Sequence, residues 1–294
     1  MEVPITVKRL SVIGAGTMGS SIAQVAATVG LPVTLYDLED RFLERAFGAM
    51  KRSQERFIKA GKLTQEHADQ ALARIKRTTS LEEACREPDY VIEAVPELID
   101  VKKPVYKQMD EMCPPHTILA SNTSQLSITV IASATKRRDK VIGTHWFNPP
   151  VMMKLIEVVK GMETSEETLQ TTLELCKRFE KEAVVCKDSQ GFITTRAILA
   201  LRLECVRMLE EGIATAEDID KALRLGFNHP MGQFELADFN GIDIGYYGAL
   251  ALTQVYGDRF RPPQTMRNLI ESGYLGRKTG KGFYDYTKVK PERG

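Results

Sequence analysis

Residues 10–29 read LSVIGAGTMGSSIAQVAATV, and this stretch decides the fold of the first half of the chain. The apolar run Leu10–Ile13 is typical of a buried strand, and Ser20–Val29 carries Ala, Ile and Val at helical spacing. Between them, Gly14 permits a tight turn, Gly16 lets the backbone approach a pyrophosphate, and Gly19 lets helix and strand pack closely. We therefore expect a dinucleotide to bind at the N-terminus of this helix.

A single acid follows at the end of the next predicted strand. Val33–Asp37 reads as a buried strand whose last residue stands 23 positions after Gly14, where a ribose-binding carboxylate belongs. An acid at this place bonds the ribose 2′-hydroxyl and repels a 2′-phosphate, so we expect NAD rather than NADP. Arg41 is a nearby cation, but its position favours the following helix. The alternative is a glycine loop that merely turns the chain.

Polar side chains follow two further buried strands. We expect parallel strands over Asp89–Val95, Thr117–Ala120 and Val141–Thr144. Glu97 and Lys102 come after the first, and the run Ser-Asn-Thr-Ser at 121–124 comes after the second. Open α/β sheets bind ligands at the carboxyl ends of their strands. Such a polar run often caps the next helix, but four residues exceed what a cap requires. The pattern predicts an α/β, Rossmann-type N-terminal domain.

The third of these strands delivers His145 to the same edge of the sheet. Two prolines turn the chain, and the return run Leu155–Val159 is apolar except for Glu157. A carboxylate inside a buried strand is costly unless a partner pairs with it, and His145 is the candidate. Such a pair raises the basicity of the imidazole and fixes its tautomer, as a general base requires. The alternative is a core histidine bonded to a backbone carbonyl, with Glu157 at an exposed strand edge.

The periodicity changes to that of helices near residue 188. Helices are expected over Phe192–Glu211, Ala216–Leu225, Phe234–Val255 and Pro263–Glu271. We therefore divide the chain into an NAD-binding domain, residues 1–187, and a mainly α-helical substrate and dimerisation domain, residues 188–294. Thr195 falls in the first turns of the first helix, facing the cleft between domains where substrates usually sit. Apolar side chains such as Tyr246, Tyr247 and Leu250 exceed what one small domain buries, which indicates a homodimer.

Composition excludes several functional classes. Forty basic and thirty-nine acidic residues leave a formal charge of +1, so no overall field attracts nucleic acid or an anionic membrane. Five cysteines without CxxC spacing argue against a zinc site, and we expect no metal. An odd cysteine count suits a reducing cytosol. With no cleavable apolar leader and no run of about eighteen apolar residues, the sequence predicts a soluble cytoplasmic protein.

Six motifs occur in one order across nearly the whole chain. They are GAGTMG at 14–19, SNTSQLSI at 121–128, THWFNPPVMMKLIEVV at 144–159, DSQGF at 188–192, HPMGQFELAD at 229–238 and TGKGFYDY at 279–286. Together they resemble the L-3-hydroxyacyl-CoA dehydrogenase family, which includes 3-hydroxybutyryl-CoA dehydrogenases. The resemblance implies a Rossmann-type domain, a helical domain that dimerises, and reversible NAD-dependent oxidation of L-3-hydroxyacyl-CoA to 3-ketoacyl-CoA.

The resemblance also implies roles for individual residues. The family's catalytic histidine and partner carboxylate match His145 and Glu157, and the serine that bonds the substrate oxygen matches Ser124. A coenzyme A contact matches Ser53. The cofactor contacts match Gly14, Gly16, Gly19, Asp37, Glu97, Lys102, Asn148 and Lys278. One position departs: where family members commonly carry an asparagine in GFxxNR, this chain has Thr195, which is shorter and lacks the amide. Substrate range is therefore not simply inherited.

In the implied mechanism, His145 takes the proton of the 3-hydroxyl while the hydride on C3 passes to the nicotinamide. Glu157 steadies the imidazolium, and Ser124 and Thr195 donate hydrogen bonds to the substrate oxygen. Two alternatives stay open. One is a related dehydrogenase that acts on a free hydroxy acid without coenzyme A. The other is a non-catalytic, structural NAD-binding protein of the same fold, because fold alone does not establish activity.

Overall fold

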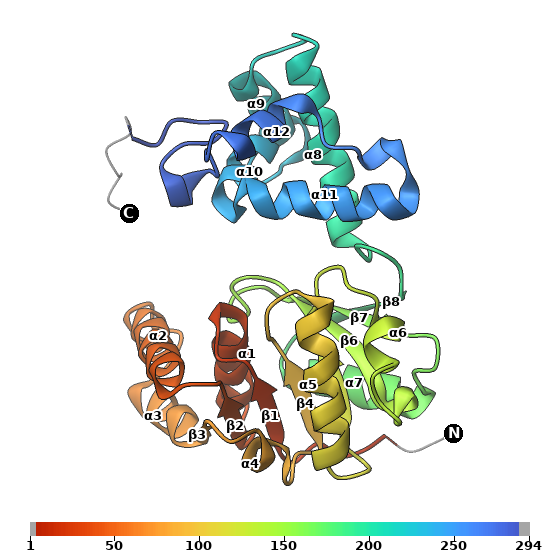
Figure 1. Cartoon of the computed structure of the whole chain (residues 1–294). Coiled ribbons are helices and arrows are strands. Elements are labelled where there is room, and N and C mark those ends of the chain that lie inside the picture. The colour runs from red at the N-terminus through yellow and green to blue at the C-terminus, as the bar shows by residue number, and fades with distance from the viewer. Residues whose placement is uncertain (1–3, 288–294) are drawn as a thin grey trace. The chain divides into compact units, whose positions relative to one another are not determined.

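The structure is a computed structural model that describes residues 4–287 of the 294-residue chain. It divides into two compact units between Phe192 and Ile193, slightly beyond the division that the sequence predicts at 187/188. The first unit is α/β and the second is mainly helical (Figure 1), which confirms the predicted fold class. Among the described residues, no helix combines the length and the apolar character needed to cross a bilayer.

The first unit is built on one eight-stranded sheet within the described residues. The strands are β1 Leu10–Ile13, β2 Val33–Tyr36, β3 Ile75–Thr78, β4 Tyr90–Glu93, β5 Ile118–Ser121, β6 Val141–Trp146, β7 Leu155–Lys160 and β8 Glu182–Lys187. Their order across the sheet is β3-β2-β1-β4-β5-β6-β7-β8. Strands β1 to β6 are parallel, whereas β7 runs antiparallel to β6 and parallel to β8. The strand order reverses between β1 and β4, which is where such sheets bind ligands.

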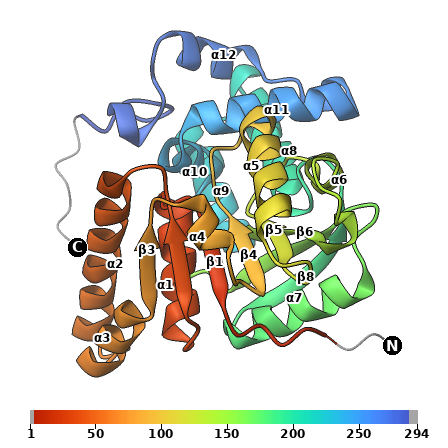
Figure 2. The same cartoon turned by 60° about the horizontal axis from the view of Figure 1, so that its bottom comes forward.

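Helices cover both faces of this sheet. They are α1 Thr17–Thr28, α2 Asp40–Lys59, α3 Gln65–Ala73, α4 Leu81–Cys85, α5 Ile99–Met112, α6 Ile128–Ala132 and α7 Glu166–Arg178, with the 3-10 turn η1 Arg138–Lys140. Apolar residues of α1, α2 and α7 pack on one face, and those of α4, α5 and α6 pack on the other. Figure 2 shows α1 and α2 beside the first strands of the sheet.

Local sequence explains where these helices begin and end. Ser165 caps α7, because its hydroxyl accepts the amide N–H of Thr168 at 3.1 Å at the start of the helix. Glu166 and Glu167 occupy the first turn of α7, and basic residues occupy its last turn, as the helix dipole favours. Helix α1 has no acidic residue in its first turn and no side-chain cap, so its N-terminal amides stay available.

The second unit contains α8 Thr194–Glu210, α9 Ala216–Phe227, α10 Gln233–Asn240, α11 Ile242–Tyr256 and α12 Gln264–Glu271, with 3-10 turns η2 Asp258–Phe260 and η3 Arg277–Thr279. The prediction of one helix over Phe234–Val255 was wrong. Gly241 interrupts it with φ +101°, a conformation that L side chains rarely adopt. Tyr246, predicted to lie on the apolar surface of the helices, is instead buried in this unit's own core, whereas Tyr247 is exposed.

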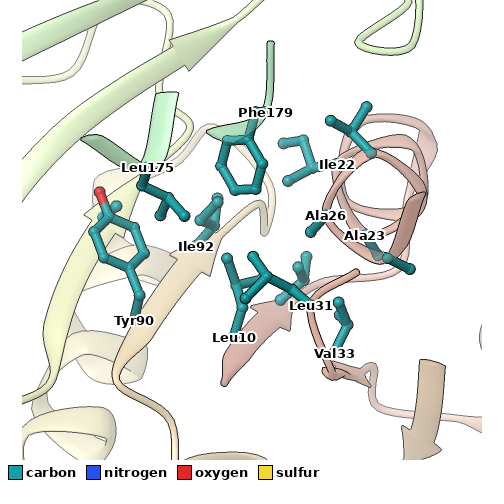
Figure 3. Packing of buried hydrophobic residues seen from close by; sticks show 14 of the residues in the cluster. Leu10, Ile22, Ala23, Ala26, Leu31, Val33, Tyr90, Ile92, Leu175 and Phe179 are labelled. Carbon is teal, nitrogen blue, oxygen red and sulfur yellow. The ribbon is translucent and has the colours of Figure 1, made fainter. Parts of the chain in front are cut away.

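Strand β6 is longer than predicted. We expected it to end at Thr144, but it continues to Trp146, so His145 lies inside the strand and not beyond it. The side chains of Thr144 and Trp146 belong to one face of the sheet and that of His145 to the other. On the Trp146 face, the indole packs against Phe179 with ring centroids 5.3 Å apart. Phe179 follows α7 and joins the core between β4 and α1 (Figure 3).

Truncating Phe179 removes the aromatic support behind the histidine strand. We expect Phe179→Ala to lower the free energy of unfolding by about 3–5 kcal/mol, because the ring is buried and leaves a cavity. Urea unfolding followed by the fluorescence of Trp146, the single tryptophan of the chain, measures the change. The exposed Met162→Ala serves as the control and should shift the same quantity by less than about 0.5 kcal/mol. A loss below about 1 kcal/mol in Phe179→Ala would contradict the packing described.

Candidate active site

The glycine loop joins the end of β1 to the start of α1. Gly14 has φ +104°, and a Cβ added there would lie 2.6 Å from the carbonyl oxygen of Ala94. A Cβ on Gly19 would collide with the carbonyl of Gly14. A Cβ on Gly16, by contrast, would meet nothing within 4 Å. The first and third glycines therefore serve the fold, while the backbone of Gly16 borders open space at the helix N-terminus, which fits a pyrophosphate.

Asp37 lies beside this loop, directly after β2. Its Oδ2 accepts the amide N–H of Ala15 at 2.7 Å, and its Oδ1 accepts that of Leu38 at 2.7 Å. The carboxylate thus sits at the edge of the glycine loop, at the place of the ribose in such folds. Arg41, the nearby cation that could have favoured a 2′-phosphate, pairs with Glu39 at 2.7 Å. The residues present therefore fit NAD.

The predicted pairing of His145 with Glu157 is confirmed. The two residues stand directly opposite each other in the antiparallel pair β6–β7. His145 Nδ1 lies 2.6 Å from Glu157 Oε2, and the exposed fractions of the two residues are 6 % and 0 %. The alternative, with Glu157 at an exposed edge, is therefore excluded. An Nδ1–H that donates to a carboxylate leaves Nε2 with the free lone pair, so the ring can take up or release one proton there.

Two aromatic rings frame the imidazole. The ring of Phe147 lies 4.5 Å from that of His145 between centroids, and the ring of Phe192 lies 6.0 Å away. Phe192 is the last residue of the first unit and is buried. Apolar neighbours of this kind limit the access of water to the histidine.

The four residues of the polar run 121–124 have different surroundings. Ser121 is buried and donates to Glu93 at 2.7 Å, while Asn122 Oδ1 accepts the amide N–H of Trp146 at 3.0 Å. Thr123 Oγ1 donates to Glu97 at 2.6 Å, and only Ser124 has an exposed side chain. None of the four caps α6, because Ser127 does so by accepting the amide N–H of Val130 at 3.2 Å. Asn122 therefore ties the Ser124 loop to the histidine strand.

Glu97 and Lys102 also lie at this edge of the sheet. Lys102, on α5, is fully buried, and its Nζ lies 2.6 Å from Glu93 Oε1 and 3.5 Å from Glu97 Oε2. Burial raises the pKa of Glu93, whereas the ammonium of Lys102 and the other donors oppose that rise. Our sequence reasoning missed Glu93. The signal was present, because Glu93 is a carboxylate at the end of a buried strand, like Glu157.

The remaining predicted residues lie further along the chain. Ser53 is half-buried in the middle of α2, and Asn148 is exposed just after β6. Thr195, on α8, and Lys278, on η3, belong to the second unit. Lys278 forms an ion pair with Asp243 at 2.6 Å. The structure brings His145, Glu157, Ser124 and the glycine loop to one sheet edge, and the approach of Thr195 and Lys278 to that edge stays a prediction.

Comparison with known proteins agrees with this geometry. The family model "3-hydroxyacyl-CoA dehydrogenase, NAD binding domain" matches residues 9–189, and the model of the C-terminal domain of the same enzymes matches residues 191–286. The chain is 42% identical to a probable 3-hydroxybutyryl-CoA dehydrogenase of Bacillus subtilis, covering 95% of this chain and 98% of that protein. It is 38% identical to the mitochondrial hydroxyacyl-coenzyme A dehydrogenase of rat, covering 96% and 92%.

A solved structure has a similar fold. The (S)-3-hydroxybutyryl-CoA dehydrogenase of Ralstonia eutropha superposes with a TM-score of 0.93 at 40% identity, covering 96% of this chain and 100% of that one. Both family models and these relatives span nearly the full length of the sequence. The chain therefore belongs to the 3-hydroxyacyl-CoA dehydrogenase family.

Proposed function

We propose that this chain oxidises L-3-hydroxyacyl-CoA to 3-ketoacyl-CoA, reversibly and with NAD, through His145 as general acid and base. The observation that carries this assignment is the 2.6 Å hydrogen bond between His145 and the buried Glu157, formed at the ligand edge of the sheet. A neutral imidazole held in one tautomer accepts a proton from an alcohol at Nε2, and the carboxylate stabilises the imidazolium that results.

The chemistry is divided between the cofactor and the protein. NAD, when bound, supplies the acceptor for the hydride that leaves C3. His145 removes the proton of the 3-hydroxyl as the C3–O bond becomes a carbonyl, and in the reverse direction it returns that proton. Ser124 donates a hydrogen bond to the same oxygen, where negative charge grows in the transition state. A fixed donor of this kind lowers the barrier most where water is excluded.

Other residues have binding roles in this proposal. Gly14, Gly16, Gly19 and Asp37 hold the dinucleotide, and Glu97, Lys102, Asn148 and Lys278 contribute to the cofactor site. Ser53 contacts coenzyme A from α2. Thr195 is a second hydrogen-bond donor to the substrate oxygen, at the position where related chains commonly carry an asparagine.

The cytoplasm stays our expectation for the compartment. The five cysteines form no disulfide, as expected in a reducing compartment, and the curated relatives include a mitochondrial enzyme.

A homodimer formed through the second unit is also part of this proposal. Ile244, Tyr247 and Val255 are each more than half exposed and lie within one face of α11. Large apolar side chains gathered on one helix face are typical of a surface that another protein covers. A second copy of the chain is the simplest partner, because most soluble oligomers are symmetric homo-oligomers.

Removing the imidazole tests the proposed base. We expect His145→Ala to lower kcat about 10²–10⁴-fold, the range for a lost acid–base group, while NADH affinity changes little. The measurement combines NADH oxidation with acetoacetyl-CoA and a fluorescence titration of NADH. His116→Ala is a matched control, because His116 is exposed and hydrogen-bonded to Asp89, at the opposite end of β4. Full activity in His145→Ala would place the base elsewhere.

Neutralising Glu157 tests the pair. We expect Glu157→Gln to lower kcat less than His145→Ala does, and to move the acidic limb of the oxidation pH profile to lower pH. The sign follows because the variant loses the carboxylate that stabilises the protonated imidazole, so protonation needs a more acidic solution. The profile of kcat/KM against pH measures the shift, with the exposed Glu182→Gln as control. An unchanged pH profile would contradict the proposal that Glu157 stabilises the protonated imidazole of His145.

Position 195 tests substrate choice. We expect Thr195→Asn to change the ratio of kcat/KM between acetoacetyl-CoA and longer or more polar 3-ketoacyl-CoAs by about 10-fold or more, because a hydrogen-bonding side chain at the acyl group discriminates strongly. Thr195→Val, which keeps the shape and removes the hydroxyl, should lower kcat for all substrates. A separate measurement tests the requirement for coenzyme A. It compares the turnover of free 3-hydroxybutyrate with that of 3-hydroxybutyryl-CoA, and equal turnover of the two substrates would contradict the requirement.

A further inference from the structure

Glu93 is a fully buried carboxylate at the centre of the ligand edge. It ends β4, with Ile13 of β1 beside it on one side and Ser121 of β5 on the other. Its Oε1 accepts the amide N–H of Val95 at 2.8 Å and the ammonium of Lys102 at 2.6 Å, and its Oε2 accepts the hydroxyl of Ser121 at 2.7 Å. A buried charge with this many donors is held in one position.

Lys102 lies between Glu93 and a second carboxylate, that of Glu97. The side chain of Lys102 has no exposed surface, and its ammonium contacts oxygen atoms of the protein. Besides Glu93, Nζ lies 3.4 Å from the carbonyl oxygen of Val95 and 3.5 Å from Glu97 Oε2. Glu93 therefore fixes Lys102, and Lys102 attracts one oxygen of Glu97.

The other oxygen of Glu97 holds the Ser124 loop. Glu97 Oε1 accepts the hydroxyl of Thr123 at 2.6 Å, the amide N–H of Ser124 at 2.8 Å and that of Gln125 at 3.3 Å. Three donors from consecutive residues converge on one carboxylate oxygen, so the backbone of the loop follows the position of Glu97. The hydroxyl of Ser124 is then the exposed group at the end of the series.

We propose that Glu93 is a positioning residue for the dehydrogenase reaction. Through Lys102 and Glu97 it holds the backbone of Ser124, so that the Ser124 hydroxyl is oriented toward the oxygen of the substrate. The inference rests on the proposed role of Ser124. It explains why a lysine and two glutamates gather at an edge where one exposed acid would suffice to cap the loop. A displacement of about 1 Å in such a donor is enough to weaken transition-state stabilisation.

The test is a double-mutant cycle between Glu93→Gln and Ser124→Ala. Glutamine keeps the shape of the side chain and removes its charge, so Lys102 loses its main partner. We expect Glu93→Gln to lower kcat about 10–100-fold with KM for acetoacetyl-CoA changed by less than about 3-fold. In the Ser124→Ala background the same substitution should lower kcat by less than about 3-fold, because the group that it positions is already absent.

Each outcome of the cycle has one meaning. An equal fold-loss from Glu93→Gln in both backgrounds would overturn the proposal, since a merely structural role does not depend on Ser124. Full turnover in Ser124→Ala alone would overturn the proposed role of Ser124 and this inference with it. A loss in Ser124→Ala together with no loss in Glu93→Gln would overturn this inference alone and leave the proposed function intact.

Two further variants separate positioning from folding. Glu93→Gln combined with Lys102→Met removes both charges and leaves no uncompensated ion in the interior, so it should fold even if the single variant does not. It should still show the lowered kcat and the same dependence on Ser124; native turnover would overturn the proposal. Tyr90→Phe is the matched control. It removes a buried hydrogen bond to Thr172 at the other end of β4, and should lower the melting temperature without lowering kcat.

Discussion

The hydrogen bond between His145 and Glu157 depends on one reversal of chain direction. Strand β6 runs parallel to β5, and β7 returns antiparallel beside β6, so that the two residues face each other in register. Side chains alternate between the faces of a sheet, and a slip of one residue would turn Glu157 to the opposite face. An unpaired carboxylate in that interior would be strongly unfavourable. The pairing of His145 with Glu157 therefore favours this register of β6 and β7 over the neighbouring ones, and this register places the two side chains opposite each other.

The same edge of the sheet holds a second buried acid, and the two acids differ in the cation that they meet. Glu157 faces an imidazole, which can accept a proton at one ring nitrogen while the other ring nitrogen donates to the carboxylate. Glu93 faces the ammonium of Lys102 at 2.6 Å, which is a compact point charge. One pair can therefore take part in proton transfer, while the other provides a constant field and a fixed geometry. The parallel strands β4, β5 and β6 bring both pairs to one edge because their carboxyl ends coincide.

Site residues that lie close together in the sequence could be predicted from it. Of the pairs that the fold brings together, only His145 and Glu157 could be predicted. Gly14, Gly16 and Asp37 follow from spacing within one strand–turn–helix–strand unit. His145 and Glu157 could be paired because a charged residue inside an apolar strand needs a partner. The same reasoning applied to Glu93 would have found it, but its partner Lys102 lies on a helix, and its burial depends on packing that no local pattern contains. The break at Gly241 was missed for a related reason, since the apolar spacing continues across it and only the backbone angle reveals the end of α10.

The last residues of the first unit are held by contacts with α6 and with the histidine. Asp188, just after β8, accepts the hydroxyl of Ser127 at 2.7 Å and the amide N–H groups of Ile128 and Thr129 at 3.1 and 2.8 Å. These three hydrogen bonds hold the end of β8 against the start of α6. Four residues later, Phe192 is buried against His145 with φ +46°, a strained angle for a bulky side chain. Strain of this kind persists only where the surrounding contacts hold it. Phe192 is the last residue of the first unit, so its packing against the imidazole helps to fix the backbone at the point where the chain leaves this unit.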